Sequence, residues 1–251
     1  MTTDLVYVVG GQPDSPGRDE MRYSLRSFEQ NLRMEWRDVW AVGVPPDWFA
    51  GARLPLEPHP NKFENQRHSL TAYVNLPGAA DRLVVLNDDM FAIEPHDEIV
   101  VCRNRHPASR WAAAEQKERA LGAWHRAVIA TATWVAETTG IDPWIYECHT
   151  PLVFDTKRLR DALAAYPTGQ PFAVGELYPV AGAGPEGEAR GNAKVKTETL
   201  GAKLNLPLPY LSGSPGSWNG PLGEYVRGEF KTPGRYEKTS TSSPETIAQV
   251  A

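Results

Sequence analysis

The pattern of apolar positions predicts buried strands in the first third of the chain. Residues 5–9, 39–42 and 83–86 form almost continuous apolar runs, which are typical of strands covered on both faces in a mostly parallel sheet. Residues 19–32 place apolar side chains at helical spacing, and residues 66–75 are a second predicted helix. Strands that alternate with helices in this way indicate an α/β domain with a mostly parallel sheet flanked by helices.

Beyond residue 91 the pattern favours helices. A long helix is expected over residues 115–138, because apolar residues and alanines recur along it and Gly140 follows it. Residues 145–151 are predicted to form a short extended segment. Asp155 suits the N-cap of a helix over residues 156–165.

Loops and a polar tail complete the second half of the chain. Residues 182–191 and 212–218 are rich in glycine and are expected to be loops, the first of them a mobile lid. The composition past residue 237 is typical of a disordered tail. We therefore expect one domain with two halves, residues 1–100 and 101–237, followed by a tail over residues 238–251.

Size and composition fit an ordinary soluble protein. The chain has 251 residues, 41% hydrophobic and 23% charged, enough for one large α/β domain. Its formal charge of −5 argues against sequence-independent binding of nucleic acid. No segment has the length and apolarity of a membrane span, and the N-terminus lacks the features of a signal peptide. With two cysteines, Cys102 and Cys148, that form no disulfide framework or zinc motif, the expected location is the cytoplasm.

The clearest chemical signal is the sequence Asn87-Asp88-Asp89, which directly follows the third predicted strand. Open α/β sheets bind their ligands at the carboxyl ends of such strands. Two adjacent carboxylates at that edge repel each other unless a cation joins them. Mg²⁺ or Mn²⁺ would do so, and through the metal a diphosphate would bind. The alternative is a solvated turn after a strand.

Two further candidates lie near the N-terminus. Gly10 and Gly11 end the first predicted strand and would allow the backbone to approach a nucleotide closely, although neither the Rossmann nor the P-loop motif is present. Arg18, Arg22 and Arg26 are four residues apart and form a basic stripe on the first predicted helix. The stripe suits either phosphate binding or a solvated helix face.

The second half contributes candidates of other chemistry. His149 ends the extended segment, and its ordinary pKa near neutrality suits a general base for a hydroxyl acceptor, or the residue is a metal ligand. A packed or surface histidine is the alternative. Lys196 is a cationic candidate for binding phosphates. Trp218 is a candidate for stacking on a sugar or base, although aromatic residues in loops more often pack internally.

Several stretches resemble, in the same order, sequence blocks of one known family. Residues 18–27 resemble the block R-x-x-E-L-R-Y-S-L-R-S of the Stealth family, and residues 86–91 resemble its block L-N-D-D-M-F. Shorter matches are, in chain order, residues 44–49 to V-P-P-W-L, His59 to the histidine of H-K-D, residues 63–66 with Asn65 loosely to F-N-S-N, and residues 149–152 to H-x-P. The four matches at residues 18–27, 44–49, 59 and 86–91 together cover roughly residues 18–91.

Stealth proteins are the sugar-1-phosphate transferases of bacterial capsule synthesis, related to the lysosomal GlcNAc-1-phosphotransferase. Phage-encoded glycosyltransferases of the GT-A type have a similar layout, including runs similar to residues 194–196 and 212–218. One departure concerns the first block, which ends in an acidic D-G-S-D-P turn in the family but in Gly10-Gly11-Gln12-Pro13 here. The missing carboxylates and the short chain favour glycosyl transfer over sugar-1-phosphate transfer.

The resemblance implies a GT-A-like fold and a metal-dependent transferase. It would move a sugar from a nucleotide-diphosphate sugar, such as a UDP-sugar, to a hydroxyl of a glycan, a protein or a hydroxymethylated base of phage DNA. Residues 1–100 would then bind the donor and residues 101–237 the acceptor. If the chain is phage-encoded, it would act in the host cytoplasm. A non-catalytic module that binds a carbohydrate or nucleotide is the other class of function that the sequence allows.

In that interpretation Asp88 and Asp89 hold Mn²⁺ or Mg²⁺, and Asn87 orients a carboxylate or contacts the ribose. Asp89 and His149 are the catalytic candidates. The donor and its phosphates would be bound by Gly10, Gly11, Arg18, Arg22, Asn87, Asp88 and Lys196. Further candidates are His59, Asn65 and Trp218.

Overall fold

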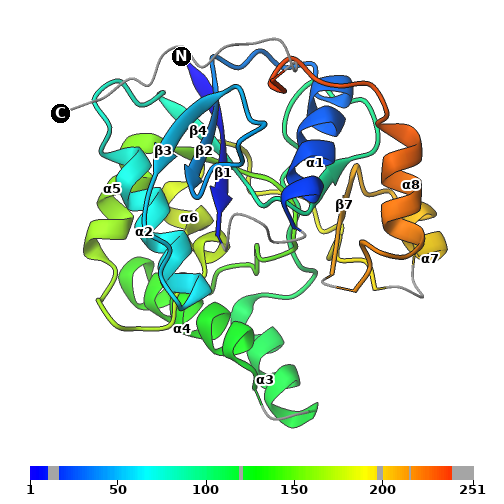
Figure 1. Ribbon diagram of the computed structural model, residues 1–251. Helices are drawn as coiled ribbons and strands as arrows, with labels where there is room; N and C mark the ends of the chain where they lie inside the picture. Colours follow the sequence, from blue (N-terminus) through cyan, green and yellow to red (C-terminus); the bar gives the residue numbers. More distant parts are fainter. Residues whose placement is uncertain (11–16, 119–120, 197–199, 215, 239–251) are drawn as a thin grey trace.

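A five-stranded sheet forms the centre of the protein in a computed structural model, which describes residues 1–10, 17–118, 121–196, 200–214 and 216–238 (Figure 1). The strand order is β3-β2-β1-β4-β6. The first four of these are parallel, and β6 runs antiparallel to β4. Their bounds are β1 (Thr3–Val9), β2 (Val39–Gly43), β3 (Ala52–Pro55), β4 (Arg82–Leu86) and β6 (Leu152–Asp155). The predicted α/β architecture with a mostly parallel sheet is confirmed.

The topology creates a crevice next to β1. From β1 the chain adds β2 and then β3 on one side, and returns through α2 (Lys62–Val74) to place β4 on the other side of β1. The direction of sheet growth therefore reverses between β1 and β4. In open α/β sheets a ligand binds at such a reversal, outside the carboxyl ends of the two strands. Here those ends lead into Gly10 and into Asn87.

Helices cover both faces of the sheet. Figure 1 shows α1 (Gly17–Asn31) on one side, and α2 with α5 (Thr156–Ala165) on the other. The predicted apolar stripe of α1 is buried at Met21, Leu25 and Phe28. The predicted N-cap of α5 is confirmed, because the Asp155 carboxylate accepts the backbone N–H of Arg158 at 2.8 Å.

α2 begins four residues before its predicted start at residue 66. The reason is the N-cap Asn61, whose side chain accepts the backbone N–H groups of Phe63 and Glu64. The first turn of α2 carries little of the apolar periodicity from which helices are predicted. Its start is therefore set by the cap.

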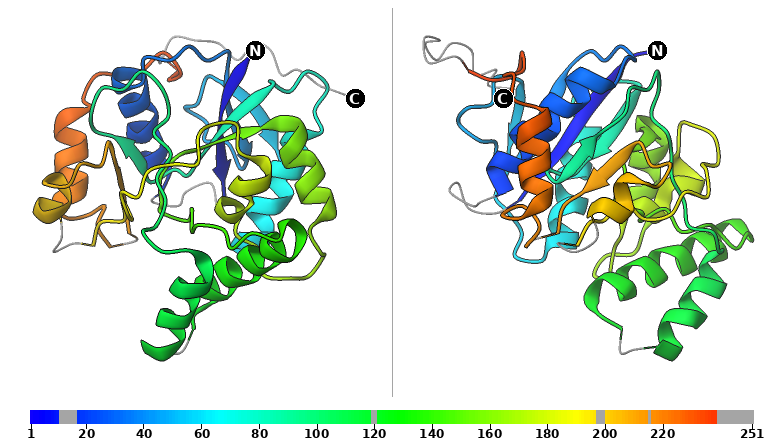
Figure 2. Two further views of the ribbon diagram at one scale, coloured as in Figure 1. Left: turned by 180° about the vertical axis from the view of Figure 1, so that it is seen from behind. Right: turned by 90° about the vertical axis from the view of Figure 1, so that its right-hand side faces the viewer.

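The single long helix predicted over residues 115–138 is wrong. Two helices stand there, α3 (Ala108–Glu118) and α4 (Ala123–Thr139), and Gly122 is the N-cap of α4. The predicted end at Gly140 is correct: this residue has φ 73° and donates its N–H to Ala136 at 2.8 Å. α3 and α4 form a pair that projects from the end of the molecule toward which β1 points (Figures 1 and 2).

The remaining elements extend the molecule beside α1. β5 (Met90–Ala92) pairs with β7 (Tyr210–Ser212) in a second, two-stranded antiparallel sheet. α8 (Pro221–Glu229) packs on it through a small apolar cluster that includes Phe91 and Trp218. The other short helices are the 3₁₀ turn η1 (Val174–Leu177), α6 (Tyr178–Ala181) and α7 (Leu200–Leu204).

The main apolar core draws on both halves of the chain. It joins β1 and β4 to residues of β6 and α5, so the segments before and after residue 100 fold together. Both cysteines are buried and free. In the described ranges no helix combines the length and apolarity needed to cross a bilayer. The expected tail, apart from Lys238, lies outside the described residues.

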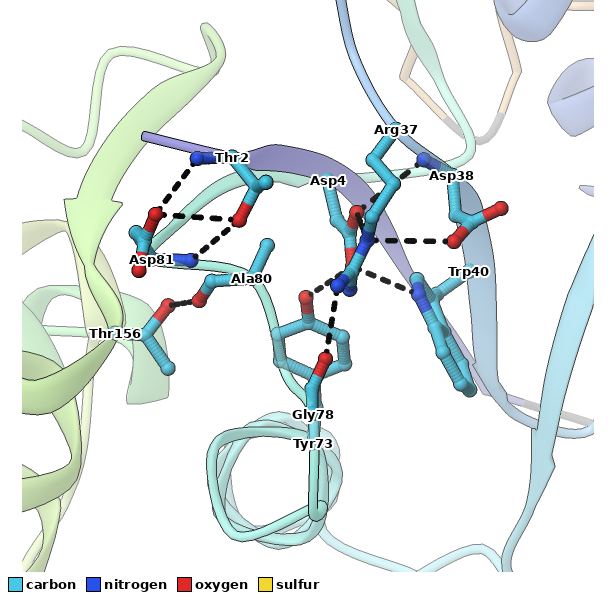
Figure 3. A network of polar contacts seen from close by, with 10 residues as sticks. All are labelled: Thr2, Asp4, Arg37, Asp38, Trp40, Tyr73, Gly78, Ala80, Asp81 and Thr156. Carbon is cyan, nitrogen blue, oxygen red and sulfur yellow. Dashed lines mark hydrogen bonds and ion pairs between the residues drawn. The ribbon is translucent and has the colours of Figure 1, made fainter.

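A buried carboxylate joins the strands at the amino end of the sheet, where the chain begins (Figure 3). Asp4 is fully buried. It accepts hydrogen bonds from the Arg37 guanidinium at 2.6 and 3.1 Å, from Trp40 Nε1 at 2.9 Å and from the Tyr73 hydroxyl at 2.7 Å. The backbone N–H of Asp38 adds a donor at 3.2 Å. The network ties β1 to the start of β2 and to the last turns of α2.

Candidate functional site

A cavity of about 310 Å³ lies at the carboxyl ends of β1 and β4. It thus occupies the point at which the direction of sheet growth reverses. Several residues singled out from the sequence line it, namely Gly10, Asn65, Asn87, Asp88, Asp89 and His149. The rest of its wall includes residues that were not among the candidate site residues, namely Lys62, Phe63, Trp124, Glu147 and Lys194, although Phe63 and Lys194 lie in stretches that resemble family blocks.

Backbone pairing brings Lys194 to Asp89. Asp89 directly precedes β5, and β5 pairs with β7, which ends at Ser212. The residues on either side of Lys194 hydrogen-bond to the backbone of Ser212 at 2.8 and 3.0 Å. As a result Lys194 Nζ lies 2.7 Å from Asp89 Oδ2, and the Ser212 hydroxyl donates to the same oxygen at 3.2 Å.

Three carboxyl groups lie close together at the acidic turn, and two of them, Asp88 and Asp89, line the cavity. Glu20, in the first turn of α1, approaches Asp88 and Asp89. Burial and the charge of Asp89 raise the pKa of Glu20 to about 7, and burial with the same neighbour raises the pKa of Asp88 to about 7. Lys194 offsets only part of this negative charge. A cation placed here would relieve the repulsion that the raised pKa values report.

The Asp88 and Asp89 carboxylates suit Mg²⁺ or Mn²⁺ if phosphates of a substrate supply further ligands. Among the described residues, no three Asp, Glu, His or Cys side chains are arranged to hold a metal ion. Mg²⁺, however, is commonly held by one or two protein carboxylates together with phosphates of the substrate. Asp88 and Asp89 fit that role. Two donors already occupy Oδ2 of Asp89, so a cation would take its Oδ1.

His149 lines the cavity and has an unusual backbone conformation. Its φ of 54° falls in the left-handed region, which non-glycine residues adopt at some cost and which is enriched at functional sites. Its ring lies near that of Trp124, with the centroids 5.9 Å apart. Burial and the ammonium group of Lys194 lower the pKa of His149 to about 4. The imidazole is therefore neutral at pH 7.

Two glutamates hold the segment that ends at His149. The Glu147 carboxylate accepts the backbone N–H of Gly175 at 2.9 Å. In return, the carboxyl group of Glu176 accepts the backbone N–H groups of Tyr146 and Glu147 at 3.1 and 3.0 Å. Glu147 lines the cavity, whereas Glu176 is fully buried.

This burial of Glu176 predicts a dependence of stability on pH. Burial raises its pKa well above the usual 4.5, so the folded protein retains a proton that the unfolded chain releases. The free energy of unfolding therefore falls as pH rises from about 4.5 toward the folded pKa, by up to about 1.36 kcal/mol per pH unit for one proton. Glu176→Gln keeps the acceptor for both N–H groups and removes this dependence.

Urea unfolding of both proteins between pH 4.5 and about 7.5 checks this expectation. The stability of Glu176→Gln should rise relative to the wild type as the pH increases. The exposed Glu137→Gln is the matched control and should follow the wild type throughout. A constant difference between Glu176→Gln and the wild type would contradict a protonated Glu176.

The arginine stripe lies outside the cavity wall. Arg26 forms a two-point ion pair with Glu237, Nε to Oε1 at 2.6 Å and Nη2 to Oε2 at 2.8 Å. Arg22 lies 3.5 Å from the same carboxylate and over the ring of Trp48. Both arginines thus anchor the C-terminal segment to α1. The side chain of Arg18 and all of Gly11 fall outside the described part of the chain.

Three other candidates also lie apart from the cavity. His59 is exposed, and its backbone N–H donates to Asn65 Oδ1 at 2.9 Å. Trp218 is buried against Phe91, with the rings 7° from parallel. Lys196 is exposed and does not line the cavity.

Comparisons with known proteins add no relative. No protein-family model matches this chain, and no curated protein matches it. The functional argument therefore rests on the α/β fold with its reversal between β1 and β4, on the cavity there and on the sequence resemblance.

Proposed function

We propose that this protein is a metal-dependent, GT-A-like glycosyltransferase, which moves a sugar from a nucleotide-diphosphate sugar to a hydroxyl acceptor. One observation carries the proposal. A single cavity at the reversal between β1 and β4 combines the adjacent carboxylates Asp88 and Asp89 with two lysines, Lys62 and Lys194.

The mixture of charges suits a diphosphate bound through a metal. Carboxylates without a metal would repel a diphosphate. A site that bound the diphosphate through lysines alone would not need the acidic turn. With a divalent cation held by Asp88 and Asp89, the carboxylates would no longer repel a diphosphate, and the lysines would neutralise its remaining charge. Lys62, at the first turn of α2, and Lys194 come from separate elements and would contact the phosphates.

The other residues of the cavity take complementary roles. Gly10 is exposed at the end of β1, and a Cβ there would lie 3.3 Å from Asn65 Nδ2, so the glycine keeps this edge open for the nucleoside. Asn87 orients a carboxylate or contacts the ribose. The metal, when bound, supplies Lewis-acid stabilisation to the leaving diphosphate. His149 faces the acceptor as a neutral imidazole.

Sugar-1-phosphate transfer is the second candidate, because it would use the same donor and the same carboxylates. The resemblance of residues 18–27 and 86–91 to the Stealth blocks favours it, whereas the missing acidic turn after β1 favours glycosyl transfer. A donor labelled with ³²P at its β-phosphate separates the two, because label enters the acceptor only in sugar-phosphate transfer. The net charge of −5 favours a glycan or protein acceptor over DNA, and we place the reaction in the cytoplasm.

Calorimetric titration with UDP and Mn²⁺ tests the proposal. We expect UDP to bind in the presence of Mn²⁺ and binding to be lost when EDTA replaces the metal. We further expect Mn²⁺-dependent cleavage of at least one sugar nucleotide among UDP-glucose, UDP-galactose, UDP-N-acetylglucosamine and GDP-mannose. Binding of UDP without cleavage of any of them would favour a non-catalytic module. Absence of metal-dependent binding for UDP and GDP alike would contradict the proposal.

A further inference from the structure

Glu147 is a carboxylate that the fold holds in the wall of the cavity. It lies two residues before His149, and both line the cavity together with Asp88 and Asp89. Its Oε1 accepts the N–H of Gly175 at 2.9 Å, which fixes the side chain. The proposed function has so far given this group no task.

The contact between Glu147 and Gly175 requires a glycine at position 175. A Cβ at residue 175 would lie 2.9 Å from Glu147 Oε1 and 3.1 Å from its Cγ, closer than ordinary van der Waals contact. Only glycine lets the glutamate side chain pack this closely on the backbone. Glu176 fixes the backbone of the same segment, because its buried carboxyl group accepts the backbone N–H of Glu147.

A group that takes a proton from an acceptor hydroxyl must become neutral or cationic in doing so. For His149 this would create a third cation beside Lys62 and Lys194, both of which oppose its protonation. Glu147 would become neutral, and burial favours its neutral form by raising its pKa. Burial therefore favours proton uptake by the carboxylate and opposes it for the imidazole. Lys62 lowers the pKa of both groups, so it favours the charged carboxylate and the uncharged imidazole that the reaction starts from.

We propose that Glu147 is the catalytic base of the reaction, a role that the sequence resemblance gives to His149. The inference rests on the proposed function. The Glu147 carboxylate takes the proton of the acceptor hydroxyl as that oxygen bonds to the anomeric carbon. The bond between this carbon and the phosphate oxygen breaks, and its electron pair leaves with the nucleoside diphosphate. His149, as a neutral imidazole, positions the hydroxyl through a hydrogen bond.

Glu147→Gln is the decisive variant, because its amide oxygen still accepts the Gly175 N–H. We expect calorimetry with UDP and Mn²⁺ to give an affinity within about twofold of the wild type, because the change is isosteric and Glu147 is not among the residues proposed to bind the metal or the phosphates. Cleavage of the sugar nucleotide used by the wild type should fall roughly 100- to 10,000-fold, the range for loss of a general base. His149→Gln should lose less activity than Glu147→Gln, and Glu137→Gln serves as the matched control.

A second variant separates catalysis from structure. Glu147→Ala opens space beside Gly175 for a small carboxylate, so added formate should restore part of the cleavage in this variant and none in His149→Ala. Equal or greater loss in His149→Gln than in Glu147→Gln, or no response of Glu147→Ala to formate, would overturn the assignment. Failure of the wild type to bind UDP with Mn²⁺ would instead overturn the proposed function.

Discussion

Replacing Asp89 with asparagine should lower the Mn²⁺-dependent affinity for UDP at least about 100-fold, since even indirect partners of metal ligands contribute 10- to 100-fold. Cleavage of a sugar nucleotide should slow by about 10³-fold, as expected when several kcal/mol of electrostatic stabilisation are lost. The expected losses are large because Asp89 is one of the two proposed metal ligands. Its side chain forms an ion pair with Lys194 and lies close to Asp88 and Glu20.

The same substitution should leave the fold intact. Asp89 is only partly buried, and it trades one ion pair with Lys194 against repulsion from two carboxyl groups. The free energy of unfolding should therefore change by no more than about 1 kcal/mol. Calorimetry, a coupled cleavage assay and urea unfolding measure the three quantities, with the exposed Asp97→Asn as control. If Asp89→Asn binds UDP as the wild type does, the Asp88–Asp89 turn holds no metal and the transferase proposal fails.

Replacing Asp4 with alanine should destabilise the protein by about 2–4 kcal/mol, because each buried donor left without an acceptor costs about 1–3 kcal/mol whereas the half-exposed Arg37 can turn to water. A domain of ordinary stability has about 5–15 kcal/mol in total, so this is the largest stability effect that we expect. The carboxylate of Asp4 is fully buried, and removing it leaves Trp40 Nε1 and the Tyr73 hydroxyl without their acceptor. The Arg37 guanidinium keeps the carbonyl of Gly78 at 2.9 Å.

Urea unfolding followed by tryptophan fluorescence measures this effect. Tyr73→Phe deletes one of the donors and should cost only about 1 kcal/mol. The neighbouring Asp38→Ala removes a half-exposed carboxylate and should stay within about 0.5 kcal/mol of the wild type. A loss of less than about 1 kcal/mol in Asp4→Ala would show that water replaces the carboxylate readily and that the network in Figure 3 adds little to stability.

The central strands could be predicted because their local pattern is sufficient. The continuous apolar runs of β1, β2 and β4 admit little besides buried strands, and the turn at residues 87–89 then falls at the carboxyl end of β4. β6 was not predicted, and the extended segment expected over residues 145–151 directly precedes it. Its antiparallel pairing with β4 joins residues about seventy positions apart, which no local pattern reveals.

The site could be predicted only in part, because contacts between residues far apart in the sequence bring its side chains together. Lys194 and Lys196 are two residues apart and chemically equivalent, and only the backbone pairing with Ser212 brings the first of them to Asp89. Arg22 and Arg26 looked like a phosphate-binding stripe, but their partner Glu237 lies 211 residues beyond Arg26. Glu147 carried no motif, and its role depends on the close packing of Gly175.

The location of the two ends of the described chain affects how large an acceptor can be used. Residue 2 and the segment that Arg26 anchors at Glu237 both lie at the amino end of the sheet, whereas the cavity is at its carboxyl end (Figures 1 and 2). A scaffold or an immobilising tag fused before residue 1, or directly after residue 238 in a shortened chain, would therefore start at the end of the sheet away from the cavity. A long polymeric acceptor could then reach the cavity without meeting the attached group.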